Sequence, residues 1–275
     1  MEKMNMKNFK VALQLYTVRD EMEKDIDKTL EAVKAMGYDF VECAGYFGKS
    51  AKEFRGLLDK HGLKTVSAHQ GFTFTEEDKE IVEYLKELGV EYGIIPWYEL
   101  EELQNNFDET VVKFTRLGQL LKDNGLKLLY HNHEFEFNKI NGEYILDKLF
   151  ASIPQDLLEP QIDTCWVHYA GVNPVEYIEK YSGRATVVHL KDFVCKALGG
   201  GPVYQLVGKE EIEPREDAGF EFRPLGLGIQ DFPAILDAAT KAGTEYVVVE
   251  QDAFVGITSL EAARVSREYL KKMGM

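Results

Sequence analysis

The fold is decided by residues 25–44, DIDKTLEAVKAMGYDFVECA, which contain one complete structural repeat. Ile26, Leu30 and Val33 recur at helical spacing, so residues 25–36 are predicted to form an amphipathic helix. Gly37 follows as a C-cap, and residues 39–44 form an apolar run typical of a buried strand. This stretch is therefore a helix–glycine–strand unit.

The same unit recurs along the chain, with a glycine between helix and strand at positions 37, 62, 89, 125 and 243. Further helices are predicted over 51–61, 76–88, 107–123, 231–242 and 258–273, with Thr75 and Asp78 as a capping box for the second of these. Predicted strands are 9–15, 39–44, 64–69, 92–97, 126–133, 158–163, 186–192 and 245–251. Eight strands alternating with helices over 275 residues, 45% of them hydrophobic, predict an α/β fold in which residues 1–275 form a single (β/α)₈ TIM barrel.

One segment interrupts this rhythm. Residues 193–230 contain Gly199-Gly200-Gly201-Pro202 and an acidic run, and no helix of normal length fits there. Long insertions in compact domains are usually functional, so we expect a loop over the barrel mouth. Gly226-Leu227-Gly228 within it is predicted as a tight turn rather than a phosphate site, because no dinucleotide motif surrounds it.

Composition narrows the classes of partner. A formal net charge of −15 disfavours nucleic acid and anionic membranes, and no apolar stretch approaches the length of a membrane span. The three cysteines, Cys43, Cys165 and Cys195, form no CxxC pair and are expected to be free thiols. Without an apolar signal segment at the N-terminus, a cytoplasmic protein with a small-molecule substrate is expected.

Polar residues gather where the predicted strands end, which is where barrel enzymes place their active groups. These positions carry five of the six histidines: His69, His131, His133, His168 and His189. Strands five to eight each offer a candidate metal ligand, namely a member of the 131–136 cluster, Asp163, His189 and Glu250. Such a set, lacking cysteine, suits Mn²⁺, Mg²⁺, Co²⁺ or Zn²⁺.

Several of these residues have a second interpretation. Asp163 could be a helix N-cap, His189 a satisfied core histidine, and Lys191 an ion-pair partner of Asp192 instead of a substrate contact. Trp97 and Trp166 could be core residues or sugar-stacking platforms. The candidate substrate contacts are Gln14, His69, Trp97, Trp166, His168 and Lys191.

Six motifs, in order through nearly the whole chain, carry a resemblance to a known family. They are ALQLYTVRDEM (12–22), GYDFVECAGYFG (37–48), YHNHEFEF (130–137), HLKDF (189–193), PLGLGIQDF (224–232) and VVVEQD (247–252), the last followed by SLEAARVSREYL (259–270). The chain resembles the xylose-isomerase-like TIM-barrel superfamily, in the branch labelled sugar phosphate isomerase/epimerase.

The resemblance implies one divalent metal, often Mn²⁺, held by Glu, Asp, His and Glu from strands five to eight. Asp163, His189 and Glu250 match the last three ligands, and Glu136 is favoured as the first because related sequences resemble HNHxxEF. Glu134 and the histidines of 131–133 remain open for that position. Members of this family are commonly dimers or tetramers, so a homo-oligomer is expected.

The resemblance also implies proton transfer next to a carbonyl, with His131 or His133 in one role and Glu250 in the other. A sugar isomerase or epimerase is the first expectation. The alternative is a lyase acting on a keto-sugar, a 3-keto-glycoside or a cyclitol, similar to inosose dehydratase. A nuclease resembling endonuclease IV is disfavoured by the acidic charge, and a non-catalytic sugar-binding barrel is disfavoured by the intact ligand set.

Overall fold

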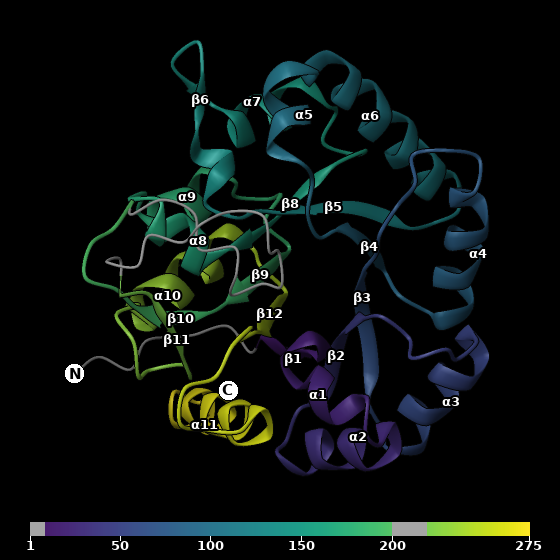
Figure 1. The fold of residues 1–275 in the computed structure, drawn as a ribbon, viewed down its shortest axis with the longest axis vertical. Coiled ribbons are helices and arrows are strands. Elements are labelled where there is room, and N and C mark those ends of the chain that lie inside the picture. The colour runs from purple at the N-terminus through teal and green to yellow at the C-terminus, as the bar shows by residue number, and fades with distance from the viewer. Residues whose placement is uncertain (1–8, 200–218) are drawn as a thin grey trace.

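The computed structural model of the protein describes residues 9–199 and 219–275 (Figure 1). Its barrel strands are β1 (Lys10–Gln14), β2 (Phe40–Ala44), β3 (Lys64–His69), β4 (Tyr92–Ile95), β5 (Lys127–His131), β8 (Glu159–Asp163), β9 (Val187–Leu190) and β12 (Tyr246–Val249). They close into a parallel barrel in the order β1-β12-β9-β8-β5-β4-β3-β2. All eight predicted strands are present, so the predicted barrel is confirmed.

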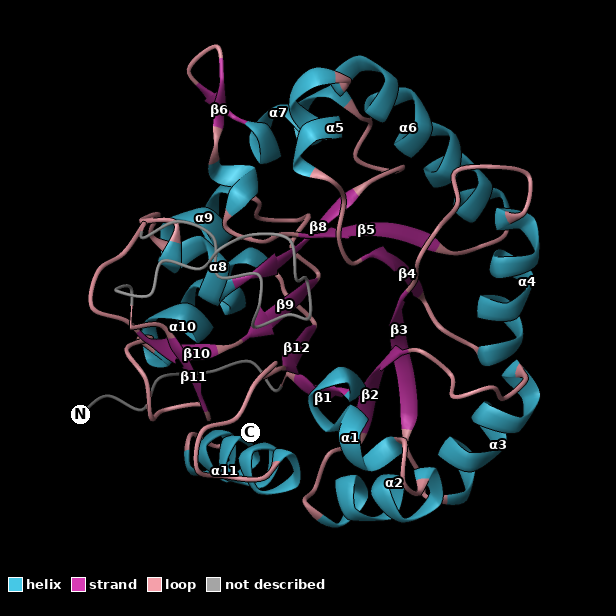
Figure 2. Ribbon diagram, in the orientation of Figure 1, coloured by secondary structure: helices cyan, strands magenta, loops and turns pink. Residues whose placement is uncertain are grey.

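Helices cover the outside of the barrel, as Figure 2 shows. The predicted ones are α2 (Ile26–Ala35), α3 (Ala51–Lys60), α4 (Asp78–Leu88), α6 (Phe107–Asp123), α10 (Phe232–Ala242) and α11 (Ser259–Lys272). Gly89 and Gly243 end α4 and α10 with φ of 87° and 86°. This left-handed conformation costs glycine no steric energy, which explains the repeated glycine between helix and strand.

Several short elements were not predicted. They are η1 (Leu15–Val18), α1 (Arg19–Met22), α5 (Leu100–Asn105), η2 (Phe135–Phe137), α7 (Ile145–Ser152), α8 (Thr164–Tyr169), α9 (Pro174–Lys180) and the hairpin of β6 (Lys139–Ile140) with β7 (Glu143–Tyr144). Segments this short do not show the 3.6-residue period clearly, so their sequence resembles loop.

The predicted capping box at Thr75 and Asp78 was wrong. Helix α4 follows Glu77 without a side-chain cap, because Asp78 Oδ1 instead accepts the backbone N–H of Thr73 at 2.8 Å. A capping box forms elsewhere, at the start of α3, between Ser50 and Glu53, the third residue of the helix.

The two ends of the predicted 193–230 loop are partly regular structure. β10 (Asp192–Val194) pairs antiparallel with β11 (Glu221–Arg223), while residues 200–218 lie outside the described residues. Leu227 N donates to Pro224 O at 3.0 Å, so the tight turn at 226–228 is confirmed. Among the described helices, none is long and apolar enough to cross a bilayer.

Residues two positions apart on a strand face the same side, and this alternation builds the site. An apolar layer inside the barrel includes Ala12, Leu129, Val187 and Val248. Two positions further along the same strands come Gln14, His131, His189 and Glu250, all buried. A polar layer therefore lies directly above an apolar one, at the carboxyl ends of the strands.

Candidate metal centre and pocket

Four residues of metal-binding type meet at the ends of β5, β8, β9 and β12. His131 ends β5, Asp163 ends β8 in register with His189 of β9, and Glu250 directly follows β12. One ligand atom from each lies within 4.8 Å of the others, and all four residues are buried. We call them the four-residue group. Imidazole and carboxylate donors at this spacing fit one divalent cation.

Asp163 uses its two carboxylate oxygens differently. Oδ1 accepts the backbone N–H groups of Cys165 (2.8 Å) and Trp166 (3.4 Å), which makes Asp163 the N-cap of α8. Oδ2 is buried and accepts no hydrogen bond within the described chain, and it lies 3.6 Å from His131 Nε2 and 3.1 Å from Lys191 Nζ. The N-cap interpretation is therefore correct and also compatible with a ligand role, because a different oxygen serves each.

Lys191 places a buried ammonium among three carboxylates. Its Nζ lies 3.1 Å from Asp163 Oδ2, 2.9 Å from Glu250 Oε2 and 3.0 Å from Asp252 Oδ2. Burial alone lowers the pKa of Lys191, but these carboxylates outweigh it and hold the pKa well above its ordinary value. The alternative pairing with Asp192 was wrong, because that carboxylate accepts the backbone N–H groups of Gly226, Gly228, Gln230 and the adjacent Phe193.

His189 lies between two buried carboxylates. Its Nε2 is 2.7 Å from Glu42 Oε1, and its Nδ1 is 2.8 Å from Glu250 Oε2. Burial alone lowers the pKa of His189, but the two carboxylates raise it to about 10. Because both ring nitrogens are engaged, the imidazole is held in one orientation at the centre of the site.

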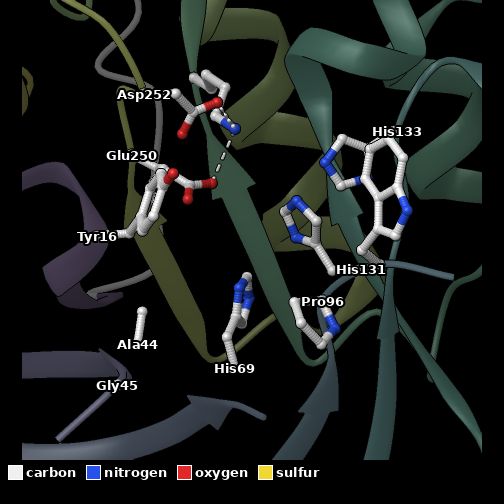
Figure 3. A pocket seen from close by; sticks show the side chains of 11 residues that line it. Tyr16, Ala44, Gly45, His69, Pro96, His131, His133, Glu250 and Asp252 are labelled. Atoms are coloured by element: carbon white, nitrogen blue, oxygen red, sulfur yellow. Dashed lines mark hydrogen bonds and ion pairs between the residues drawn. The ribbon is translucent and has the colours of Figure 1, made fainter. Parts of the chain in front are cut away.

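A cavity of about 390 Å³ opens beside this group (Figure 3). It is lined by Tyr16, Ala44, Gly45, His69, Pro96, Trp97, His131, His133, Lys191, Glu250 and Asp252. The aromatic, small and histidine residues lie at the ends of β1 to β5, while the carboxylates and Lys191 follow β9 and β12. The volume suits a small molecule, which would meet a charged wall on one side and a neutral wall on the other.

His133 is an uncharged base on the pocket wall. It is 6% exposed, and its Nδ1 has no hydrogen-bond partner among the described residues. The ring stacks on Phe135 and meets Trp97 edge-on, with centroids 5.7 and 4.6 Å apart. Burial, reinforced by the charge of Lys191, holds the pKa of His133 well below its ordinary value. The ring is therefore neutral, with its Nδ1 unpaired among the described residues.

Glu136, the expected first metal ligand, lies outside the four-residue group. It belongs to η2, where Oε1 accepts Tyr130 Oη at 2.6 Å and Oε2 accepts the backbone N–H of His133 at 2.8 Å. Burial raises the pKa of Glu136 to about 8, so it holds a proton at neutral pH. We therefore replace Glu136 with His131, whose place at the end of β5 directs it into the barrel.

Three candidate substrate contacts lie away from the pocket wall. Gln14 donates to a buried carboxylate, Trp166 is fully buried against Phe220, and His168 Nδ1 lies 2.7 Å from Gln230 Oε1. The other three, His69, Trp97 and Lys191, line the pocket together with the candidate catalytic residues His131, His133 and Glu250. Trp166 still supports the wall, since its ring is 5.3 Å from Lys191 Nζ.

Sequence reasoning did not select Tyr16, Glu42 or Asp252, all of which belong to the site or its support. Tyr16 and Asp252 line the pocket, and Glu42 contacts His189. The alternation of side chains along a strand could have identified two of them, Asp252 and Glu42. Asp252 is two residues after Glu250, and Glu42 is a single carboxylate between apolar residues of a buried strand.

Comparison with known proteins places this architecture in a family. The profile described as xylose isomerase-like TIM barrel matches residues 30–273. The chain belongs to this family. Its sequence is 26% identical over 281 residues to an inosose dehydratase from Clostridium beijerinckii, covering 91% of this chain and 90% of that protein.

Solved structures of xylose isomerase-like barrels share the fold. A sugar phosphate isomerase/epimerase from Parabacteroides distasonis matches with a TM-score of 0.76 at 23% identity, covering 98% of this chain and 95% of that one. The IOLI protein, solved with a binding zinc atom, matches with a TM-score of 0.67 at 18% identity, covering 96% and 97%. The family expected from the six sequence motifs is confirmed.

Proposed function

We propose that this protein is a metal-dependent dehydratase that removes water from a neutral cyclic keto-polyol of the inosose class. The observation that carries the proposal is similarity to inosose dehydratases over about nine tenths of both chains. The four-residue group supports the metal dependence, and a relative of the same fold was solved with zinc. The lyase alternative thus takes precedence over the isomerase or epimerase first expected.

The charges around the pocket favour an uncharged substrate. Glu250 and Asp252 face the cavity, and Lys191 is the one cationic side chain among the described lining residues. Its ammonium is already paired with three carboxylates, so it offers little attraction to a phosphate. A phosphate would be repelled by the two carboxylates, whereas hydroxyl groups could hydrogen-bond to them.

The chemistry follows from the residues that line the pocket. A divalent cation in the four-residue group would polarise the substrate carbonyl and stabilise the negative charge that develops on its oxygen. His133 is the candidate acceptor for the proton from the carbon beside the carbonyl, because it lines the pocket and its Nδ1 has no hydrogen-bond partner among the described residues. The Lys191 ammonium keeps the surrounding carboxylates in place.

The elimination balances with these groups alone. The C–H electron pair moves toward the carbonyl, and it returns to form a C=C bond as the β C–O bond breaks. The departing hydroxide takes the proton held by His133, which gives an unsaturated ketone and water and restores the neutral imidazole. The same first step, with the proton returned to carbon, would give an isomer or epimer.

Proton NMR in D₂O tests the proposal on a panel of keto-inositols, ketoses and their phosphates, with Mn²⁺ or Zn²⁺ restored to chelator-treated protein. We expect loss of a ring hydroxyl from an unphosphorylated keto-inositol and no turnover of phosphates. Deuterium exchange beside the carbonyl without elimination would instead establish the isomerase. Absence of both reactions with a ligand that binds would establish a binding barrel.

A histidine variant tests the assigned base within the same assay. His133→Asn should lower the rate of exchange about 10²- to 10⁴-fold, because general base catalysis is worth that much. His61→Asn is the matched control, since His61 lies at the end of α3 and outside the pocket. Equal rates for the two variants would remove His133 from the mechanism.

A further inference from the structure

Glu42 is a fully buried carboxylate beneath the metal-binding residues, and it does not line the cavity. Five side chains surround it. Oε1 is contacted by Gln14 Nε2 (2.7 Å), His189 Nε2 (2.7 Å) and His69 Nε2 (3.0 Å), and Oε2 by Ser67 Oγ (2.5 Å) and Gln161 Nε2 (2.6 Å). Strand register places it between Gln14 and Ser67 on β1 and β3. Its position is therefore fixed from both sides.

An ionised carboxylate accepts hydrogen bonds but cannot donate them, so each nitrogen that faces Glu42 must carry a hydrogen. For His189 that nitrogen is Nε2. Nδ1, 2.8 Å from Glu250 Oε2, also faces a carboxylate in the metal-free protein, so a cation held there would replace the hydrogen on Nδ1 while Nε2 keeps its own. Glu42 thus turns the lone pair of His189 toward the other ligand atoms.

The effect extends to His131 through Gln161. Because Gln161 must present its NH₂ to Glu42, its amide oxygen faces the opposite way, 2.9 Å from His131 Nδ1 and 2.8 Å from His69 Nε2. That oxygen accepts a hydrogen from Nδ1, so the lone pair of His131 lies on Nε2. This is the nitrogen on the side of Asp163 Oδ2, at 3.6 Å.

We propose that Glu42 is a positioning residue that orients both imidazoles of the four-residue group, His189 directly and His131 through Gln161. One buried carboxylate then selects the donor nitrogen of two ligands on different strands. Partners of metal-binding histidines act in this way in general, fixing the tautomer and ring orientation. The inference rests on the proposed metal role but is independent of the substrate.

Metal affinity in the absence of substrate provides the test, with Mn²⁺ and Zn²⁺ titrated calorimetrically into chelator-treated protein. Glu42→Gln should weaken the dissociation constant about 10- to 100-fold, the usual cost of losing such a partner. Ser67→Ala is the control, because it removes a donor to Glu42 without touching a histidine, and its affinity should stay within about threefold. Unchanged affinity in a folded Glu42→Gln protein would overturn the proposal.

Two further measurements separate positioning from general destabilisation. In the Zn²⁺ complex, ¹⁵N NMR of the imidazoles should show His189 protonated on Nε2 and His131 on Nδ1, and Glu42→Gln should change this pattern. If that variant does not fold, Gln161→Met tests the branch to His131 alone, with an expected loss of affinity and no change in the His189 signals. Wild-type protein that binds no divalent metal would refute both this inference and the metal role, whereas metal binding without dehydration would refute only the substrate class.

Discussion

The carboxylates that surround Lys191 and the carboxyl of Glu136 are all buried but differ in their neighbours. The charged centre consists of Asp163, Glu250 and Asp252 around Lys191, with His189 beside Glu250. Glu136 is equally buried, and its carboxylate accepts hydrogen bonds from two neutral donors, the Tyr130 hydroxyl and the backbone N–H of His133. The pKa of Glu250 is held well below its ordinary value because Lys191 and His189 outweigh burial, whereas burial raises that of Glu136 to about 8.

The difference teaches that burial alone does not identify a metal ligand. A buried carboxylate remains ionised, and so remains a ligand, only where positive charge compensates for lost hydration. For Glu250 that compensation comes from Lys191 and His189, whereas for Asp163 and Asp252 burial still outweighs Lys191 and raises the pKa. The Tyr130 hydroxyl and the His133 backbone N–H bring no positive charge to Glu136, and a proton takes its place.

The largest expected effect comes from removing ligands of the charged centre. Asp163→Ala/Glu250→Ala should lower bound metal from about one divalent ion per chain to nearly none, because two of four donors are lost. Metal analysis after dialysis measures the content. Glu136→Gln is the matched control and should keep its metal. The reverse result, with metal lost from the Glu136 variant, would restore Glu136 as the first ligand.

The next effect concerns the ammonium that compensates these carboxylates. Lys191→Met should destabilise metal-free protein by about 3–5 kcal/mol, because it leaves Asp163, Glu250 and Asp252 buried without their cation. Added Mn²⁺ or Zn²⁺ should recover much of this loss by binding the folded state. Denaturant unfolding with chelator and with metal measures both. A loss that metal does not reduce would mean that Lys191 acts mainly through packing.

Much of the barrel could be predicted because its signals are local. The apolar runs, the helical stripes and the glycines after helices each follow from neighbouring residues, and all eight strands were predicted. Short elements such as α7, α8 and α9 were missed because their length conceals the period. The Thr75–Asp78 capping box was wrong because a backbone N–H outside the motif competed for the carboxylate.

The site was predicted less completely because it depends on where a strand ends. HNHEFEF contains two histidines followed by two glutamates, and the sequence alone does not show which of the four is the metal ligand. Because β5 ends at His131, the side chain of His131 points into the barrel and can reach the metal site. Glu136 belongs to η2, beyond the end of the strand, and lies outside that site. Asp163, His189 and Glu250 lie on three different strands, so their convergence could be expected from barrel topology but not measured from the sequence.

A smaller effect is the pH dependence of stability, which distinguishes Glu136 from the charged centre. The pKa of Glu136 in the folded protein, about 8, lies above its ordinary value of 4.5, so the folded state holds a proton that the unfolded chain releases. Its stabilising contribution is complete below pH 4.5 and is lost as the pH rises through 8. Glu136→Gln should therefore gain stability relative to wild type between pH 5 and pH 8.5, by about 3–4 kcal/mol, because each unit of pKa shift is worth about 1.4 kcal/mol. Denaturant unfolding measures this difference in unfolding free energy between the variant and wild type. A difference that is the same at pH 5 and pH 8.5 would contradict the assignment of a protonated Glu136.

The smallest expected effect comes from removing the Tyr130 hydroxyl, a neutral hydrogen-bond donor to Glu136. Tyr130→Phe removes the hydroxyl that Glu136 Oε1 accepts at 2.6 Å, and it should cost about 1 kcal/mol at pH 6. The cost should grow above pH 8, because an ionised carboxylate loses more from a missing donor than a protonated one does. Comparing the unfolding free energies of Tyr130→Phe, Glu136→Gln and the double variant at both pH values measures the coupling. Additive effects at pH 8.5 would show that the hydroxyl does not stabilise the carboxylate. Coupling that strengthens with pH would establish that this neutral hydrogen bond stabilises the ionised form.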